Sequence, residues 1–436
     1  MWVRLVLQNF ENIRTEEAME AILEDIPTGL HDLYARILTS IENDPHTRDL
    51  RKSILTWVVL AATPLSLDEL RCAIKLDLSQ TIPNMAKAIP DICGQLVFVD
   101  QSQKVQIIHD TSRQFLLQAN LEFHLSIQVS DASTRLSFLL LQYLRSGVLK
   151  ARQSSDTRLL SVQSIGGPRG PLKVPDQALL DHAARFFPYH IQHSGAEMSA
   201  LTEELVSFLK SRNVLHWIEH HAQRRDLSGI INAAMNFKAY LERIKVDGTS
   251  DSQAQSIDPW VVDLVRVAAK FRAELLSCPS SIHCLVPPLC PPQSLISQSF
   301  SRDAKPPPLL VRNLPDGGWD DCLARIDYTE DDWTIVVTHG QGLFAVGFSS
   351  GQVAMYGSNS LQHVGDLKHD GWVELLRLYL QDDILVSCSR KKLTAWDTRT
   401  GISIGSSPLP SLPLDMMFLG SDELLMLCQN SGLVKL

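Results

Sequence analysis

A histidine and an aspartate, His109-Asp110, stand where an apolar run meets the start of a helical pattern. The run Val105–Ile108 predicts a strand, and Phe115-Leu116-Leu117 predicts the apolar face of a helix that Asp110 or Thr111 would cap. Amides and the helix dipole at such a junction favour anions, so the pair is a candidate for phosphate contact. The alternative is a histidine that bonds to local backbone at a strand-to-helix turn.

Three further histidines, His216, His220 and His221, include the i, i+4 spacing of a helical zinc pair. No Glu stands between them in the hydrolase pattern, and the sequence offers no obvious third ligand. A polar helix face is therefore favoured over a metal site.

Cysteines and a histidine also gather near the middle of the chain, at Cys278, His283, Cys284 and Cys290. Their gaps and the intervening prolines differ from zinc-finger spacing. The chain holds no His-Glu-x-x-His motif, and its two Gly-x-Ser-x-Gly matches, residues 347–351 and 401–405, lie in the strand-rich segment after Trp333 and not at a strand-to-helix elbow. We therefore predict no metal site, no catalytic residue and no hydrolase activity.

The elements around His109 predict how it is positioned. Leu96–Leu117 has the pattern strand, turn, strand, helix. Before it, Leu30–Ile41 has apolar residues at helical spacing, and Ile54–Ala62 is apolar on nearly every side. Ser66 and Glu69 have the spacing of a capping box that starts a third helix. Three helices followed by a two-stranded hairpin are typical of a winged helix.

Winged helices often bind DNA, but the charges disfavour that function here. The segment that would enter a major groove, Asn84–Cys93, holds Lys87 as its one basic residue, and the hairpin tip holds Lys104. Phosphate neutralisation needs several Lys or Arg, and Pro90 would disturb a recognition helix. The net charge of −9 points the same way, so we predict no nucleic-acid partner.

The stretch from about Leu121 to Phe300 is predicted to be mainly helical. Six segments carry helical apolar spacing: Leu136–Leu144, Leu179–Phe187, Leu201–Leu209, Val214–Ile218, Ile230–Leu241 and Trp260–Leu276. The residues between Pro287 and Pro308 are rich in proline and are predicted to form an extended connector.

From Trp333 the apolar period changes to that of strands, and a repeat appears. Tyr356, Trp396 and Leu436 are spaced 40 residues apart, each at the end of a strand–turn–strand unit. The Trp396-Asp397 ending and this period are typical of WD-repeat propellers, in which these residues would pack the blades. A generic β-meander is the alternative. About two and a half blades are present, too few for the roughly four to eight that close a ring.

The composition is that of an ordinary globular protein. The 436 residues are 44% hydrophobic and 20% charged, enough for about two to four domains. The eight cysteines lack CxxC spacing and no N-glycosylation sequon occurs, which predicts free thiols in a reducing compartment. No signal peptide or membrane-length apolar run is apparent, so we expect a soluble cytoplasmic protein without a membrane partner.

Several ordered blocks resemble fungal NACHT-type signalling ATPases. IPTGLHDLYARIL at residues 26–38 is similar to their LPxGLxxLYxRIL signature, and residues 54–70 resemble the block that follows it. Residues 92–97 and 107–117 are similar to the winged helix named after GPI inositol-deacylase-like proteins, and residues 277–283 resemble a block that precedes the propeller.

This resemblance implies a STAND architecture: effector, NACHT nucleoside triphosphatase, winged helix, helical linker and WD-repeat sensor. Such proteins resemble vegetative (heterokaryon) incompatibility proteins, which recognise a ligand through the propeller and oligomerise. The resemblance implies that His109 touches the ADP phosphate and that Asp110 holds the adjoining backbone.

One part of that architecture is missing from the sequence. A phosphate-binding loop needs Gly-Lys-Ser/Thr, and no glycine in this chain is followed by lysine. Since the first residues have no cap before an apolar run, we expect that the domain has lost its beginning. ADP or ATP with Mg²⁺ is therefore expected only for a longer form, and this chain is expected not to be an enzyme.

The fold class expected is multidomain α+β. The order is the last helices of a NACHT module (1–45), winged helix (46–120), helical linker (121–286), proline-rich connector (287–332) and incomplete WD-repeat propeller (333–436). The expected function is self/non-self signalling, with a protein partner on the WD repeats and homo-oligomers in the active longer form. A stand-alone interaction scaffold is the alternative, and the ATPase of a longer chain is third.

Overall fold

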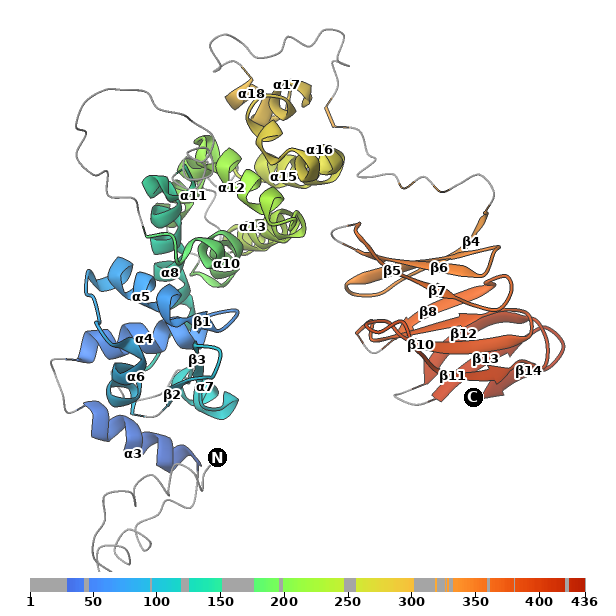
Figure 1. The fold of residues 1–436 in the computed structure, drawn as a ribbon, viewed down its shortest axis with the longest axis horizontal. Coiled ribbons are helices and arrows are strands. Elements are labelled where there is room, and N and C mark those ends of the chain that lie inside the picture. Colours follow the sequence, from blue (N-terminus) through green and yellow to red (C-terminus); the bar gives the residue numbers. More distant parts are fainter. Residues whose placement is uncertain are drawn as a thin grey trace, which may run out of the picture. The chain divides into compact units, whose positions relative to one another are not determined.

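The chain divides into two compact units, which are described separately. Unit 1 comprises Met1–Leu264 and Leu275–Asp316, and unit 2 comprises Val265–Glu274 and Gly317–Leu436. The computed structural model (Figure 1) describes residues 30–42, 47–94, 96–118, 125–150, 176–195, 199–246, 256–301, 318–319, 326, 328, 332–358, 361–379, 381–419 and 423–435. The helix expected within Met1–Glu24, Cys322 and Leu436 lie outside the described residues.

Unit 1 begins with the order of elements predicted for a winged helix. These elements are α3 (Leu30–Glu42), α4 (Arg48–Leu60), β1 (Leu65–Ser66), α5 (Leu67–Leu78), α6 (Met85–Cys93), β2 (Val97–Val99), β3 (Lys104–Ile107) and α7 (Asp110–Leu116). The capping box is confirmed, because Ser66 Oγ accepts a bond from Glu69 N (3.3 Å) and Ser66 N donates to Glu69 Oε2 (2.6 Å). It fixes the start of α5 directly after β1.

The predicted hairpin is also confirmed, and a third strand joins it. β2 and β3 pair antiparallel with Val97 opposite Ile107, and Asp100 Oδ1 closes their turn by accepting bonds from Ser102 N and Lys104 N. The sequence did not predict β1, whose Leu65 pairs with Val105 on the free side of β3. The sheet order β1-β3-β2 therefore places β3, the strand that leads to His109, at the centre.

Pro90 lies inside α6, and the helix continues through it. Asn84 Oδ1 caps the start by accepting a bond from Lys87 N, and Gly94 ends the helix in the left-handed conformation. Arg51 of α4 donates from Nε to Ile92 O (2.7 Å) and is almost fully buried. The burial of Ile89 and these end contacts compensate for the amide that proline lacks.

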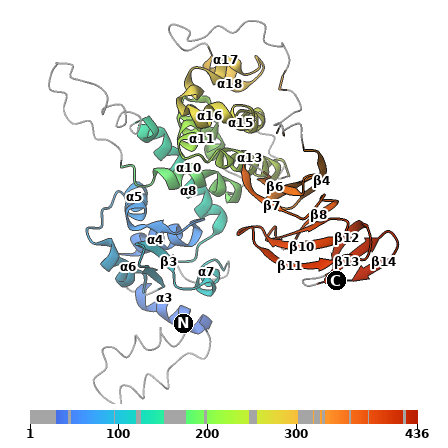
Figure 2. The same cartoon turned by 45° about the vertical axis from the view of Figure 1, so that its right-hand side comes forward.

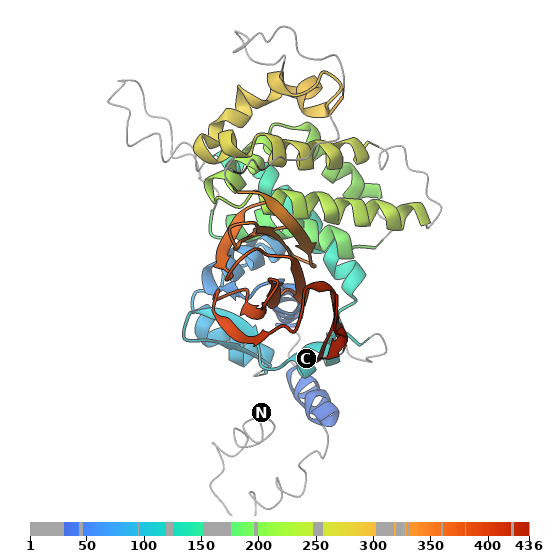
Figure 3. The ribbon, with the colours of Figure 1, turned by 90° about the vertical axis from the view of Figure 1, so that its right-hand side faces the viewer.

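The middle of unit 1 is helical across its described residues, as Figures 2 and 3 show, and each of the six predicted segments lies in a helix. The elements are α8 (Val129–Tyr143), the π-helical turn η1 (Leu144–Val148), α10 (Leu180–His193), α11 (Ser199–Lys210), α12 (Asn213–Gln223) and α13 (Ser228–Val246). They are followed by α15 (Asp258–Lys270) and α16 (Arg272–Ser277), of which residues 265–274 are assigned to unit 2. The last predicted segment is two helices that break at Phe271. Phe187, Phe208, Trp217 and Phe237 pack edge to face or tilted at the centre of this array.

The prediction of an extended connector from residue 287 is wrong for the residues up to 301. They include most of α17 (Val286–Leu289) and all of α18 (Leu295–Phe300), and the 3₁₀ turn η2 (Pro279–His283) comes just before them. Proline is compatible with the first positions of a helix, where its missing N–H is not needed, and α17 has proline there. Asp263 Oδ2 accepts a bond from Ile296 N (3.0 Å), which ties α18 to α15. The helical region therefore extends to Phe300, past the boundary predicted at residue 286.

Unit 2 contains three antiparallel sheets, each a meander of consecutive strands (Figure 1). The first has β4 (Thr334–His339), β5 (Leu343–Phe348), β6 (Gln352–Gly357) and β7 (His363–Lys368); the second has β8 (Leu375–Tyr379), β9 (Ile384–Cys388), β10 (Lys392–Asp397) and β11 (Ser403–Pro408); the third has β12 (Pro413–Leu419), β13 (Glu423–Cys428) and β14 (Gly432–Lys435). The predicted change of period and the strand–turn–strand repeat are confirmed.

Each sheet packs on the next through a shared apolar core. One core joins the first two sheets and includes Val353, Val373 and Leu385, and another joins the second and third and includes Val386 and Met426. Across residues 332–358, 361–379, 381–419 and 423–435 these sheets form no closed barrel or ring. The structure therefore shows successive antiparallel sheets, without a complete propeller.

Among the residues that the structure describes, no helix has both the length and the apolar composition that crossing a bilayer requires.

Candidate functional site

His109 is the cap of α7, a role that the sequence assigned to Asp110 or Thr111. Its backbone is extended (φ −163°), and its Nδ1 accepts a bond from Thr111 N (3.2 Å). Asp110 is the first residue of the helix, and its Oδ2 accepts a bond from Gln114 Nε2 (3.0 Å). His109 is the cap because its backbone is extended and lies before the helix. From there its side chain reaches the free amides of the first turn better than the side chain of a residue already in the helix does.

The cap leaves one ring nitrogen of His109 for another contact. With Nδ1 accepting from a backbone amide, the neutral ring carries its proton on Nε2. Among residues 30–42, 47–94 and 96–118, no hydrogen bond involves Nε2, and the side chain is exposed. The arrangement offers a single N–H donor to an acceptor such as a phosphate oxygen.

Helix α3 holds the same junction from its other side. Tyr34 OH and Thr111 Oγ1 are 2.8 Å apart, and the Tyr34 and Phe115 rings pack with centroids 5.5 Å apart. His31 meets Phe115 edge to face at 5.1 Å. Helix α3 therefore contacts the helix that begins with Asp110.

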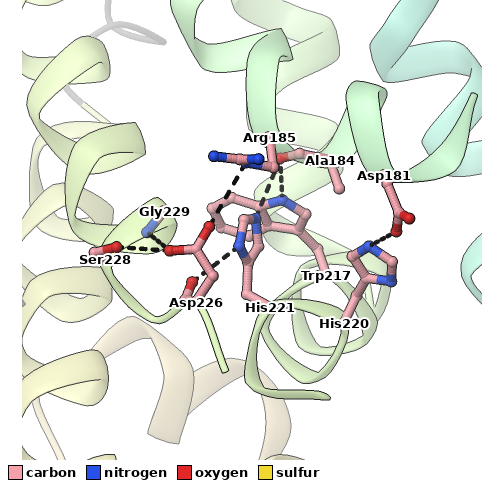
Figure 4. Close-up of polar contacts among 9 residues, drawn as sticks. All are labelled: Asp181, Ala184, Arg185, Trp217, His220, His221, Asp226, Ser228 and Gly229. Carbon is pink, nitrogen blue, oxygen red and sulfur yellow. Dashed lines mark hydrogen bonds and ion pairs between the residues drawn. The ribbon is translucent and has the colours of Figure 1, made fainter. Parts of the chain in front are cut away.

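The histidines of α12 are directed to three different places, and His216 and His220, which have the i, i+4 spacing, contact different partners. His220 Nε2 lies 3.0 Å from Asp181 Oδ1 on α10, and His221 contacts the carbonyl oxygens of Ala184 (3.2 Å) and Asp226 (3.1 Å), as Figure 4 shows. Both histidines are buried, so the expectation of a polar helix face is wrong for them. Their surroundings are the packed interface of α10, α12 and α13.

His216, the third of these histidines, meets residues that the sequence did not connect with it. Its Nδ1 is 3.9 Å from Glu219 Oε2, and His283 Nε2 of η2 is 2.7 Å from the same oxygen. Burial raises the pKa of Glu219, but the attraction of His216 and His283 outweighs it and lowers that pKa to about 2. Within the described part of the chain, these are the one group of three His, Cys, Asp or Glu side chains with metal-ligand spacing.

The cysteines weighed as zinc ligands do not converge. The seven described cysteines are free, as predicted, and Cys278 is exposed whereas Cys290 is buried. Burial raises the pKa of the Cys290 thiol above its usual range, which disfavours the thiolate that zinc requires.

In unit 2, Trp396 connects the second sheet to the loop that precedes it. Its Nε1 donates to Ser387 Oγ (2.8 Å), and the same oxygen is 2.8 Å from Nδ1 of the buried His369. Trp396 also packs against the core shared with the first sheet. This packing agrees with the role predicted for Trp396, whereas the sequence gave no signal for His369 and Ser387.

Tyr356 and Asp397 have different structural roles. Tyr356 is buried on the face of the first sheet that is turned away from the second, where it stacks on Phe344 with centroids 5.1 Å apart. Asp397 is partly exposed and accepts bonds from Thr400 N (2.8 Å) and Arg399 N (3.0 Å), which lower its pKa and close the turn after β10. Leu436, the third residue of the predicted set, is outside the described residues.

A pocket lies beside His369, on the loops that follow β7 and β9. Six residues line it: Asp370, Gly371, Trp372, Ser389, Arg390 and Lys391. The Trp372 side chain is half exposed, and ion pairs stand at the rim, from Arg390 to Glu374 (2.9 Å) and from Lys392 to Asp370 (3.1 Å). An aromatic surface with a polar, charged rim is typical of protein-recognition sites.

Comparison with known proteins shows the kind of domain that one part of the chain forms. Residues 38–128 match the family model described as the winged helix domain of GPI inositol-deacylase. This region is a winged helix domain. It contains the β1-β3-β2 sheet and places His109 at the end of its central strand. The match covers a minor part of the 436 residues and says nothing about the sheets of unit 2.

Comparisons with curated proteins and with solved structures support no further statement about fold or function. No curated protein matches the chain. Two computationally designed proteins are similar in structure: Ika8, at 16% identity over 23% of this chain and 32% of its own (TM-score 0.21), and Ika4, at 12% identity over 24% of this chain and 90% of its own (TM-score 0.18). The matched part thus spans about a third of Ika8, and TM-scores this low support no inference about fold or function.

Proposed function

We propose that the chain is a non-catalytic recognition and switching module of a NACHT-type signalling protein, of the kind used in fungal self/non-self recognition. In this proposal the sheets of unit 2 are WD-repeat blades that bind a protein partner. The winged helix domain reports the nucleotide state in a longer form of the protein, which would bind ADP or ATP with Mg²⁺ and oligomerise when active.

The observation that carries the recognition role is the pocket around Trp372. It lies on loops between strands, where a rigid scaffold commonly presents binding residues. The His369–Ser387–Trp396 hydrogen bonds and the core beneath the second sheet hold these loops in place. A half-exposed tryptophan on a fixed support can anchor a partner at a small cost in conformational entropy.

The charges around the pocket favour a protein over a nucleic acid. Arg390 and Lys392 each pair with a carboxylate, so their charge is locally balanced. The net charge of −9 adds no general attraction for phosphate. A partner segment with an apolar anchor and polar flanks fits this surface best.

The switching role rests on the winged helix domain. His109 keeps Nδ1 in the α7 cap and has Nε2 as a donor, and α3 contacts α7 through Tyr34. A NACHT module would place a phosphate oxygen beside His109. His109 follows the central strand and contacts Thr111, which in turn contacts Tyr34 of α3, so a change at the phosphate would reach both elements. In this proposal the phosphate-binding loop belongs to a longer form of the protein, because this sequence holds no Gly-Lys-Ser/Thr.

The recognition role predicts a large effect of Trp372→Ala on binding. Peptides selected from a random display library against the full chain should bind wild type and lose about 30-fold or more in affinity for Trp372→Ala, the effect of a hot-spot tryptophan. Fluorescence polarisation with the purified chain measures these affinities.

Ile402→Ala is the matched control for that experiment. Ile402 is another large exposed apolar residue of unit 2, at 66% exposed against 52% for Trp372. Its truncation should leave the affinity unchanged. Equal losses in the two variants, or selected peptides that are indifferent to Trp372, would overturn the assignment of the pocket.

A further inference from the structure

We propose that His216, Glu219 and His283 form a binding site for a divalent transition-metal ion, with Zn²⁺ as the ion that its ligands fit best. The site lies between α12 and η2 of unit 1, and it shares no residue with the recognition pocket of unit 2 or with the His109 cap. It is independent of the function proposed above.

The fold builds the site from two elements that are distant in sequence. His216 and Glu219 are three residues apart on α12, so they lie on one face of the helix. His283 closes the 3₁₀ turn η2, which packs directly on α12. The imidazole rings of His216 and His283 are 4.6 Å apart between centroids, and Glu219 lies against both.

The distances are close to those of a coordinated metal. The three ligand atoms all lie within 4.8 Å of one another. A tetrahedral zinc ion with ligands at about 2.0–2.2 Å separates them by about 3.3–3.6 Å. The His283–Glu219 pair, at 2.7 Å, would open slightly, and the His216–Glu219 pair, at 3.9 Å, would close slightly. Both changes are below 1 Å, and the remaining pair of ligand atoms, which lies within 4.8 Å, would close as well.

The surroundings suit an ion that remains accessible. The Glu219 side chain is only 6% exposed, and a dication held between it and the two imidazoles would balance the charge of its carboxylate. The His283 side chain is 22% exposed, which leaves a path from solvent and room for water as a fourth ligand. Calcium and magnesium prefer oxygen ligands, whereas two imidazoles and one carboxylate are typical of zinc sites.

The bound ion would fasten η2 to α12. The two elements are separated by α13, α15 and α16 in the sequence. A metal bridge between them therefore limits the opening of the last helices of unit 1, as other metal sites stabilise the folded state.

The test is zinc binding by the full chain after chelator treatment and dialysis. Calorimetry and elemental analysis should find one zinc ion per chain at this site, and zinc should raise the melting temperature. His216→Ala, Glu219→Gln and His283→Ala should each lower the affinity by about 100-fold or more, since three ligands are the minimum for a protein zinc site. His339→Ala is the control, because His339 is an exposed histidine of unit 2, and should leave the affinity unchanged.

A second measurement does not depend on variants that fold. Co²⁺ added to the wild-type chain should give the intense visible absorption of a tetrahedral site, and Zn²⁺ should abolish it by displacement. A wild-type chain that retains no zinc, an octahedral Co²⁺ spectrum, or zinc affinity unchanged in folded ligand variants would each overturn the proposal.

Discussion

Asp382→Ala is expected to destabilise unit 2 by about 2–4 kcal/mol, because a buried carboxylate that accepts several backbone bonds would be lost. Asp382 lies in the turn after β8, and its Oδ1 and Oδ2 accept bonds from Gln341 N (3.1 Å), Gly342 N and Leu343 N (3.0 Å) of the first sheet. The residue is buried, and a β-carbon on Gly340 would lie 1.5 Å from Oδ1. The carboxylate therefore fits a turn that only glycine permits.

Two variants separate the possible causes of this loss. Asp382 has φ +74°, a conformation that Asn also tolerates, so Asp382→Asn keeps the backbone and should cost less than alanine. Asp383→Ala removes the neighbouring carboxylate, whose partner Arg399 is largely exposed, and should cost less than about 1 kcal/mol.

Urea titration followed by hydrogen exchange of peptides from each unit measures these free energies of unfolding. Asp382→Ala should lower the midpoint of unit 2 and leave that of unit 1 unchanged. Equal effects of Asp382→Ala and Asp383→Ala would contradict the structural role of this carboxylate.

Unit 1 is expected to lose stability steeply as the pH falls below about 6.5, because three buried histidines resist protonation. The pKa of His182 is lowered to about 4, that of His190 to about 3 and that of His221 to about 4. Burial is the main cause for all three, and the charges of neighbouring histidines contribute for His190 and His221. In the unfolded chain these residues take up protons near pH 6.5. Between about pH 6.5 and the pKa values of the folded state, the protein takes up protons when it unfolds.

The sign of this effect follows from proton linkage. Since the unfolded state binds more protons, the stability is fully present above pH 6.5 and falls as the pH is lowered to about 4 or 3. Each histidine contributes a slope of about 1.4 kcal/mol per pH unit within its window. Urea midpoints of unit 1 measured across this window should therefore decrease with falling pH.

His190→Phe isolates one of these contributions. His190 is fully buried, and neither of its ring nitrogens has a hydrogen-bond partner among the described residues. Phenylalanine fills the site without a titrating group. The slope of the stability of unit 1 against pH should therefore decrease by the contribution of one proton, about 1.4 kcal/mol per pH unit. His363→Phe, on an exposed position of β7, should leave the slope of unit 1 as it is. An equal slope in wild type and His190→Phe would contradict a contribution of His190 to the pH dependence of unit 1.

Local patterns predicted much of this fold. The Ser66–Glu69 spacing gave the start of α5, and the apolar period from Trp333 gave the strands of unit 2, since both signals act over a few residues. β1 was missed because Leu65 and Ser66 form too short a run and are strand residues only through pairing with β3. The helices α17 and α18 were missed because the prolines there suit helix starts as well as extended chain.

The candidate sites depend on contacts that the sequence does not encode locally. His216 was considered with His220, and His283 with the cysteines, yet the fold brings His216 and His283 together on Glu219. The His216-x-x-Glu219 spacing was a visible signal, but the packing of η2 on α12 was not. Asp382 acts on residues about 40 positions away in the chain, through the packing of one sheet on another.

The recognition role of unit 2 is tested most directly by the place where a bound partner protects the chain. Hydrogen exchange of the full chain, with and without a peptide selected for binding to it, maps that place. We predict that the bound peptide slows hydrogen exchange at residues 369–374 and 388–393, the two segments that carry Trp372 and Arg390. Protection confined to the winged helix domain, or to the helices of unit 1, would contradict it.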